Sequence, residues 1–468
     1  MKNYMKKIAY VFLAGILSGC LTGCGSNVGK SVSIRIANIG NKVTSEEYNN
    51  AMHKYYPGVT IAESVDYAYN DENFFSRADN NMVGNLFSSW YTEIDKLAEK
   101  GYIADLTEYC KKYNVETFLD PQLKKIVTYN GRIYGIPVDT YVQNLLINKE
   151  IFIKAGLVDS NGNIKYPKTY NELAEYAHII SEKTDAAGFV IPSCGGDGGW
   201  HLLNIAWSFG TEFEKENASG EWRAEFNSKE FVDALNYIHD LRWKYNATAE
   251  NVYLDQDAVI RLFGNNKVGM IFCPATSVSL TDYYKLNKDN MMFVEMPKGP
   301  YGAYAQMGGN VYMITSSSTD EEIEACFEAM EYMGNLPGVT KDYLSRLDEE
   351  LDERNRQKRM IEPDIFLKKY LKRYMVNKPE KDISEAIENV YNKYLSLDGA
   401  FFEKAFNYEN IIVRPEEPVA CQDLYRVLDE CILTILTDEN ADIKTIAEEA
   451  CQKFQTRFLD PVNQKNGK

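Results

Sequence analysis

The feature that most constrains the fold is an alternation of short strand patterns with capped helix patterns. Val32, Ile34 and Ile36 alternate with polar residues, which predicts a strand, and the apolar runs Val59–Ile61 and Val268–Phe272 predict two more. A Glu follows three residues after a Ser, Thr or Asn, as at a helix start, in Thr44–Glu47, Thr169–Glu172, Asn227–Glu230 and Ser318–Glu321. Strands that alternate with capped helices are typical of the α/β class.

The composition argues against one class of function and indicates a globular chain of several domains. The chain has 468 residues and a formal net charge of -17, from 51 Lys+Arg against 68 Asp+Glu. This charge works against a nucleic-acid partner, because phosphate binding depends on cationic contacts. Hydrophobic residues at 45% and charged residues at 25% are typical of a globular chain. At about 150 residues per domain, the length predicts two or three domains.

The N-terminus is predicted to direct export. Basic residues in Met1–Lys7 precede the apolar run Ile8–Leu17, which is shorter than the about 18 residues that a membrane span needs. Two segments that resemble a bacterial lipobox follow, and they end at Cys20 and Cys24. We therefore expect a signal peptide over 1–23, a lipid on Cys24 with Cys20 as the alternative, and a tether over 24–30. The other interpretation is an ordinary signal peptide with two accidental cysteines.

The sequence predicts no catalytic residue, no metal and no cofactor. Of nine cysteines, seven remain beyond Cys20 and Cys24, and none belongs to a CxxC pair. Cys326, Cys431 and Cys451 occupy apolar helical positions, where buried free thiols are expected. The HExxH, GxSxG and SxxK motifs are absent from the sequence.

A series of motifs carries a family resemblance. The segment Gly131–Gly156 contains "IYGIP" followed by "NKEIFIKAG", which resembles the hinge segment of family 1 extracellular solute-binding proteins, the carbohydrate-type binding proteins of ABC importers. Further segments resemble motifs of this family in the same order, namely His53–Val59, Lys96–Leu106, Pro167–Leu173, Phe263–Ile271 and Met307–Asn310. Two departures are Asn85–Phe87, where the family often has Pro-Asp-Val, and Cys273–Thr276, where it usually has Gly-x-Trp.

The resemblance implies the fold and the domains. It implies a two-lobed α/β fold of the periplasmic-binding-protein-like type II class, with lobes joined by crossing hinge segments and with extra C-terminal helices. Lobe 1 would comprise 31–137 and 305–344, and lobe 2 would comprise 138–304 and 345–420. The C-terminal helices would occupy 421–468. The lobes would close around a solute by hinge motion.

The resemblance also locates candidate solute-binding residues. A sugar needs aromatic faces for its C–H surfaces and carboxylates or amides for its hydroxyls. Loops that the resemblance assigns to the cleft carry both kinds of side chain. The candidates are Asp66, Tyr67, Ser89, Trp90, Asp139, Tyr141, Asp197, Trp200, His201, Gly308, Gly309 and Asn310. Trp207, Trp222 and Trp243 are expected to pack in the core or on the surface, and His201 with Cys194 is too weak a pattern for a metal site.

The predicted function is therefore capture of a sugar or oligosaccharide and its delivery to the permease subunits of an ABC transporter. We expect a monomer, lipid-anchored to the cell membrane and facing the extracellular side, and no enzyme. Two alternatives stay open. One is a lipid-anchored glycoside hydrolase, because the 68 acidic residues include chance carboxylate pairs. The other is a surface adhesion lipoprotein.

Overall fold

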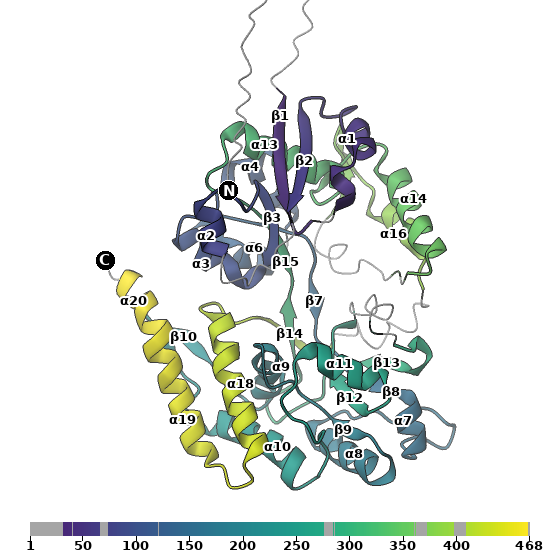
Figure 1. Cartoon of the computed structure of the whole chain (residues 1–468), viewed down its shortest axis with the longest axis vertical. Coiled ribbons are helices and arrows are strands. Elements are labelled where there is room, and N and C mark those ends of the chain that lie inside the picture. The colour runs from purple at the N-terminus through teal and green to yellow at the C-terminus, as the bar shows by residue number, and fades with distance from the viewer. Residues whose placement is uncertain are drawn as a thin grey trace, which may run out of the picture.

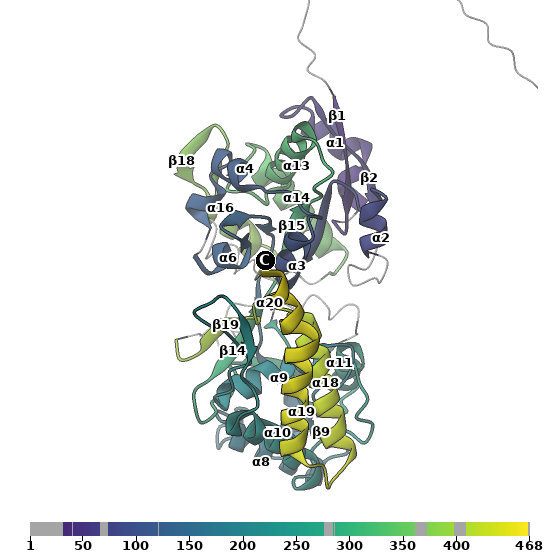
Figure 2. The same ribbon diagram turned by 90° about the vertical axis from the view of Figure 1, so that its left-hand side faces the viewer.

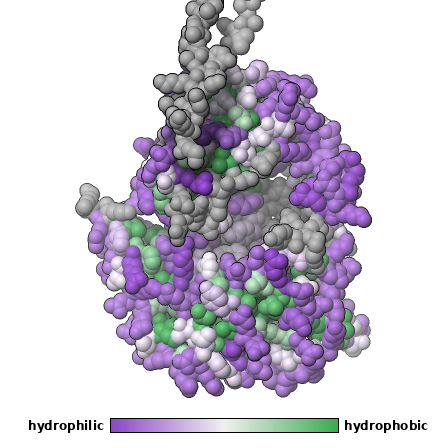
Figure 3. Space-filling model, viewed as in Figure 1, coloured by the Kyte–Doolittle hydropathy of each residue, from purple (hydrophilic) through white to green (hydrophobic). Residues whose placement is uncertain are grey.

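The chain forms two α/β lobes, one above the other in Figure 1. The computed structural model describes residues 31–39, 41–65, 74–119, 121–275, 284, 286–359, 361, 372–396 and 409–466. Hydrophilic side chains cover most of the surface seen in Figure 3, while apolar patches gather on lobe 2. The two-lobed α/β fold predicted from the motifs is confirmed.

Lobe 1 is built on a five-stranded sheet in the order β2-β1-β3-β15-β6. Strand β1 runs parallel to β2 and β3, and β15 runs antiparallel to β3 and β6. Helix α13 packs against β1 and β2. The strands are β1 (Val32–Ala37), β2 (Val59–Val65), β3 (Leu86–Trp90), β6 (Ile136–Pro137) and β15 (Asn310–Ile314), with the hairpin β4 (Thr128–Tyr129) and β5 (Arg132–Ile133) beside them. The helices are η1 (Asn41–Thr44), α1 (Glu46–Met52), α2 (Phe74–Asp79), η2 (Tyr91–Glu93), α3 (Ile94–Glu99), α4 (Thr107–Lys112), α5 (Val115–Phe118), α6 (Pro121–Ile126) and α13 (Asp320–Met333).

Lobe 2 is built on a four-stranded sheet in the order β13-β8-β12-β9, with helices around it. Helix α18 packs against α9, α10 and α19, and Figure 2 shows α18 and α19 side by side along this lobe. The strands are β8 (Leu145–Asn148), β9 (Ala187–Phe189), β12 (Val268–Phe272) and β13 (Met291–Val294), with the hairpin β10 (Glu214–Glu216) and β11 (Trp222–Ala224). The helical segments are α7 (Lys149–Lys154), α8 (Tyr170–Lys183), α9 (Asp197–Ser208), α10 (Lys229–Trp243), α11 (Gln256–Gly264), η4 (Lys288–Asn290), α18 (Cys421–Thr437), α19 (Ile443–Phe454), the π-helical η5 (Gln455–Leu459) and α20 (Asp460–Asn466).

A small sheet of three strands lies where the chain passes between the lobes. It has the order β19-β14-β7, with β7 (Tyr141–Val142), β14 (Tyr304–Gly308) and β19 (Ile412–Pro415). Strand β14 also packs against α9 of lobe 2, so the chain re-enters the lobe 1 sheet with β15 rather than at residue 305 as predicted.

The described residues 345–359 and 372–396 pack on lobe 1, although the segment 345–420 was predicted for lobe 2, whereas β19 later in that segment pairs with β14 at the crossing. Arg346 on α14 donates to the Tyr332 carbonyl on α13 over 2.7 Å, and Asn114 of lobe 1 donates to the Tyr374 hydroxyl over 3.2 Å. The segment forms its own small apolar core, which includes Leu351 and Ile387. Its elements are β16 (Gly338–Val339), α14 (Tyr343–Arg356), β17 (Tyr374–Met375), β18 (Lys378–Asp382) and α16 (Ser384–Asn392).

Helix starts agree with the capping patterns, with three shifts of one residue. Thr169 caps α8 as predicted, since its side chain accepts from the Glu172 N–H. The other caps are Ser45, Ser228 and Thr319, each one residue later than the first residue of the predicted pattern. Each of these hydroxyls accepts a backbone N–H three residues ahead, which satisfies a free donor of the first turn.

Other predictions concern single residues. Cys326, Cys431 and Cys451 are buried free thiols, as expected. Trp207 is 1% exposed and donates its indole N–H to Glu417 over 2.8 Å, so it packs in the core. None of the described helices is long and apolar enough to cross a membrane. The lipidation candidates Cys20 and Cys24 lie outside the described residues.

Candidate functional site

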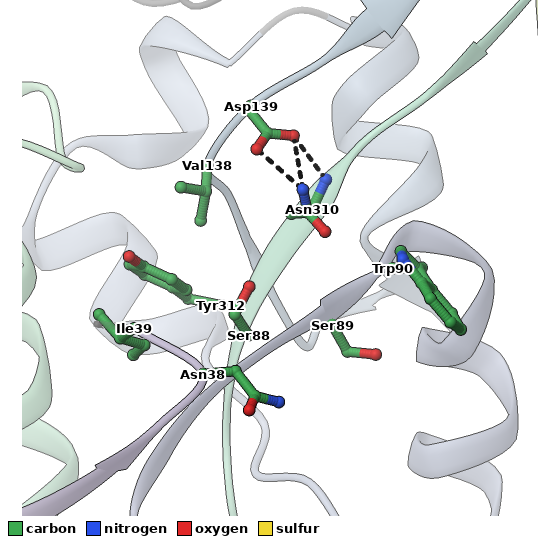
Figure 4. Close-up of a pocket in the computed structure, with 9 residues that line it drawn as sticks. All are labelled: Asn38, Ile39, Ser88, Ser89, Trp90, Val138, Asp139, Asn310 and Tyr312. Carbon is green, nitrogen blue, oxygen red and sulfur yellow. Dashed lines mark hydrogen bonds between the residues drawn. The ribbon is translucent and has the colours of Figure 1, made fainter. Parts of the chain in front are cut away.

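A pocket of about 430 Å³ lies at the edge of the lobe 1 sheet, next to the chain crossings (Figure 4). The parallel strands β1 and β3 end at this edge, the first crossing passes it, and β15 begins there. Solutes in open α/β sheets bind outside the carboxyl ends of the strands, so this edge is where a binding site is expected. The pocket is lined by Asn38, Ile39, Ser88, Ser89, Trp90, Val138, Asp139, Asn310 and Tyr312.

Asp139 and Asn310 tie the two crossing segments together inside this pocket. The Asn310 side-chain amide donates to both carboxylate oxygens of Asp139, over 3.0 and 2.8 Å, and the Asn310 backbone N–H donates over 2.9 Å (Figure 4). A solute that bonds to either side chain therefore contacts both crossings at once. This is a direct route by which binding can act on the arrangement of the lobes.

Gly309 makes this close approach of the crossings possible. A Cβ atom at this position would lie 2.3 Å from the Asp139 carbonyl oxygen and 2.7 Å from the Tyr91 ring. The same carbonyl accepts the Tyr91 hydroxyl over 2.5 Å, and that hydroxyl also lies 2.9 Å from Thr140 Oγ1. Gly309 is therefore needed because a larger residue would not fit between the crossing segments. The same holds for Gly308, where a Cβ atom would lie 2.3 Å from the Tyr141 hydroxyl.

The predicted candidate Ser89 belongs to the pocket residues, but its hydroxyl points to the buried side of β3. Its side chain is only 4% exposed, and its hydroxyl has no hydrogen-bond partner among the described residues. The hydroxyl that β3 brings to the pocket is that of Ser88, which is partly exposed and lies on the same side of the strand as Trp90. Trp90 and Tyr312 add aromatic surface to the same pocket.

Tyr141 of the crossing strand β7 and Trp200 of helix α9 form a separate aromatic pair. Their ring centroids are 5.7 Å apart in an edge-to-face arrangement. Close to this pair, the Glu416 carboxyl accepts the Tyr425 hydroxyl over 2.8 Å, and burial raises the pKa of Glu416 to about 7. Neither ring lines the lobe 1 pocket, so these two predicted residues are separate from the predicted residues that line it.

His201 and Asp197 brace helix α11 instead of lining the pocket. His201 is 1% exposed, its Nε2 lies 2.6 Å from Gln256 Oε1, and burial lowers its pKa to about 4. Asp197 accepts the Gln256 backbone N–H over 2.8 Å. Both side chains therefore connect α9 to the start of α11. The described residues contain no group of three or more His, Cys, Asp or Glu side chains that could hold a metal.

Several pocket residues were not predicted from the sequence. Asn38 and Ile39 directly follow β1, and the rule that ligands bind at the carboxyl ends of strands could have identified them. Val138 and Tyr312 neighbour the predicted Asp139 and Asn310 but gave no signal of their own. The predicted candidates Asp66 and Tyr67 lie outside the described residues.

Buried carboxyl groups predict how stability depends on pH. Burial raises the pKa values of Asp95 and Glu416 to about 7 and the pKa of Asp429 to about 6. Because such groups have a pKa of about 4 in an unfolded chain, the folded protein binds more protons between about pH 4 and 7. Proton binding by these buried carboxyl groups stabilises the folded state, and this contribution is lost as the pH rises through 6 to 7. We expect a higher melting temperature at pH 5.5 than at pH 8 by calorimetry, and a lower one at pH 5.5 would contradict these assignments.

Two α/β lobes, crossing strands and a polar and aromatic pocket at the crossing define the class of two-lobed binding proteins. Residues 78–336, more than half of the chain, match the family of bacterial extracellular solute-binding proteins, and the chain belongs to this family. The resemblance read from the motifs is thereby confirmed.

Relatives and solved structures are similar to this chain over different lengths. A polygalacturonan/rhamnogalacturonan-binding protein of Bacillus subtilis is 26% identical over 48% of this chain and 46% of its own length. The lipoprotein LipO of the same organism is 24% identical over 51% of this chain and 50% of its own. The chain thus spans about half the length of these curated relatives. A solute-binding protein of Thermotoga lettingae, solved with alpha-D-tagatose, superposes with a TM-score of 0.63 at 19% identity, over 91% of this chain and 98% of that one.

Proposed function

We propose that this protein captures a sugar or oligosaccharide between its lobes and delivers it to the permease of an ABC transporter. The observation that carries this proposal is the pocket in which Asp139, Asn310 and Ser88 offer hydrogen-bonding groups beside the Trp90 ring. Carboxylate, amide and hydroxyl groups bond to the hydroxyls of a sugar, and an aromatic face covers its C–H surface. The names of a relative and of the superposed structure, which include polygalacturonan, rhamnogalacturonan and alpha-D-tagatose, agree with a sugar as the solute.

A second part of the proposal concerns the charge of the solute, which follows from the charge of the pocket. Asp139 is the one charged side chain among the nine described residues of the pocket. A uronic acid would bring a second carboxylate next to it, and like charges at close range repel. We therefore propose a neutral sugar, in contrast to the polygalacturonan of the Bacillus subtilis relative.

The experiment is a thermal-shift screen of the purified protein against neutral sugars and galacturonate oligosaccharides. At a sugar concentration 100-fold above Kd, binding stabilises the fold by about 2.7 kcal/mol. We expect at least one neutral mono- or oligosaccharide to raise the melting temperature and to be recovered unchanged. Stabilisation only by galacturonate oligosaccharides would overturn the charge assignment. Hydrolysis of the sugar would favour a glycosidase, and stabilisation only by a peptide would overturn the sugar assignment.

The proposal also includes a monomer tethered by lipid at Cys24, with Cys20 as the alternative, on the outer side of the cell membrane. The lipobox behind a basic and apolar leader supports the tether, and the matching lipoprotein LipO agrees with it. Two acyl chains are needed for stable anchoring, which a diacylglyceryl group on cysteine provides. Mass spectrometry of the mature N-terminus should find a diacylated cysteine, and an unmodified terminus elsewhere would contradict the tether.

A further inference from the structure

Two glutamine side chains face each other where the first and second crossings pass between the lobes. The antiparallel β7–β14 ladder ends with the pair Val142 and Met307. The Gln143 N–H donates to the Gln306 carbonyl over 2.9 Å, so these two residues form the next pair. Side chains of opposite residues in an antiparallel pair project to the same face, with Cβ atoms about 5 Å apart. The two amide groups are therefore within reach of each other.

The amide group of Gln143 makes no hydrogen bond. Gln143 is 0% exposed, and neither its Nε2 nor its Oε1 has a partner among the described residues. Gln306 is equally buried, and its Oε1 has no partner there either. A buried amide group that loses its water and gains no hydrogen bond costs free energy, and native folds contain few such groups. This cost destabilises the present arrangement of the crossings relative to one in which the amide groups are paired.

Bonds to lobe 2 fix the position of Gln306. Its Nε2 donates to the Tyr425 hydroxyl of α18 over 2.8 Å, and that hydroxyl donates to Glu416 Oε1 over 2.8 Å. The Gln306 backbone N–H donates to Asn204 Oδ1 of α9, also over 2.8 Å. Because Gln306 is fixed, the two amide groups can pair only when Gln143 moves, and Gln143 belongs to the first crossing.

The first crossing connects Gln143 to the pocket. Asp139, which precedes Gln143 on this crossing, lines the pocket, and its carbonyl accepts the Tyr91 hydroxyl of lobe 1 over 2.5 Å. No described residue of the lobe 2 sheet or of its helices lines this pocket, so the present arrangement is not closed around a solute. Closure of lobe 2 over the pocket must move the crossings, because they join the lobes.

We propose that Gln143 is a positioning residue whose amide group pairs with Gln306 Oε1 when the lobes close around a solute. The inference rests on the proposed function, because it takes a sugar as the solute that closes the lobes. The amide group of Gln143 is unpaired in the present arrangement, and in the closed arrangement its Nε2 donates to Gln306. This difference favours closure, and a sugar that binds the closed arrangement gains affinity to the same extent.

The first test is the variant Gln143→Met, since methionine has a similar length and no group that needs a hydrogen bond. The variant removes the unpaired amide group from the present arrangement, so the melting temperature of the protein without sugar should rise by about 1–3 °C. It also removes the bond from the closed arrangement, so the affinity for the sugar should fall about three- to tenfold. Scanning and titration calorimetry measure the two effects.

The opposite signs of these two effects distinguish a positioning role from a structural one. A residue that only supports the fold would lower the melting temperature when it is replaced. A melting temperature below that of the unaltered protein, or an unchanged affinity for the sugar, would overturn the proposal.

The matched control is Thr211→Val in lobe 2. Thr211 is 1% exposed, and its hydroxyl has no partner among the described residues. Valine has nearly the same size without the hydroxyl, so this variant should also raise the melting temperature, but it should keep the affinity of the unaltered protein. A three- to tenfold fall in this control would show that affinity follows stability, which would contradict the role of Gln143.

A double-mutant cycle tests the partner of Gln143. Gln306→Met removes the acceptor Oε1 together with the bond to Tyr425, and the loss of that bond is common to both variants of the cycle that carry it. In this background the further change Gln143→Met should no longer alter the affinity for the sugar. A second three- to tenfold fall would show that Gln143 does not act through Gln306.

These tests separate the inference from the proposed function. If no sugar binds, the proposed function fails, and the melting temperature of Gln143→Met still tests whether the amide group is unpaired. If a sugar binds equally tightly to the unaltered protein and to Gln143→Met, the proposed function stands and the role of Gln143 is refuted. If Gln143→Met does not fold, a crystal structure of the sugar complex decides. Gln143 Nε2 should then lie within hydrogen-bond distance of Gln306 Oε1, and a longer separation would overturn the proposal.

Discussion

Replacing Trp90 with alanine should weaken binding of the sugar by about 30- to 1,000-fold. This range corresponds to the about 2–4 kcal/mol that truncation of a dominant aromatic contact costs. Trp90 ends β3 at the pocket, beside the Asn310 with which it pairs across the sheet. The loss of its flat apolar face leaves the C–H surface of the sugar exposed to water. Calorimetric titration of the variant with the sugar found in the screen measures the effect.

Two further variants make this prediction specific. Trp90→Phe keeps an aromatic face and should lose less than about tenfold in affinity. Trp222→Ala, on the β10–β11 hairpin of lobe 2, removes another partly exposed tryptophan outside the pocket and should leave the affinity unchanged. An unchanged affinity in Trp90→Ala would mean that the sugar binds elsewhere.

Replacing Asp429 with alanine should lower the free energy of unfolding by about 3 kcal/mol. Asp429 on α18 is 7% exposed and accepts the backbone N–H groups of Gly196 and Gly199, over 2.6 and 2.8 Å. It thereby joins α18 to the start of α9. The alanine leaves two buried donors without a partner, and each such group costs about 1–3 kcal/mol. Urea denaturation followed by circular dichroism measures the loss.

The matched control is Asp423→Ala on the same helix. Asp423 has a 34% exposed side chain and pairs with Arg426 over 3.1 Å, and such surface pairs contribute about 0–1 kcal/mol. We expect Asp423→Ala to be nearly as stable as the unaltered protein. Equal losses in the two variants would show that the bonds from Asp429 to the start of α9 are unimportant.

Local patterns in the sequence predicted the secondary structure where one physical cause dominates. Period-2 alternation identified β1, and the continuous apolar run of β12 identified a strand buried along its whole length. Capping patterns identified four helix starts, but three caps lie one residue later because Ser45, Ser228 and Thr319 each stand next to another possible cap. Propensity alone cannot choose between two adjacent hydroxyl or amide residues.

The tertiary arrangement was less accessible to sequence reasoning. The segment 345–396 was assigned to lobe 2, yet Arg346 and Tyr374 bond to residues of lobe 1. Nothing local in a charged helix indicates which surface its apolar side covers. The family motifs pointed to Ser89, Trp90, Asp139 and Asn310, which meet in one pocket. They also pointed to His201, whose burial next to Gln256 depends on long-range packing that the sequence does not display.

The most direct test of the account is a crystal structure of the protein with the neutral sugar that stabilises it best. We expect the sugar between the lobes, with its hydroxyls bonded to Asp139 or Asn310 and a ring face on Trp90. We also expect Trp200 of lobe 2 on the opposite side of the sugar. A sugar bound on an outer surface of either lobe, with the residues of the lobe 1 pocket untouched, would contradict the proposed site.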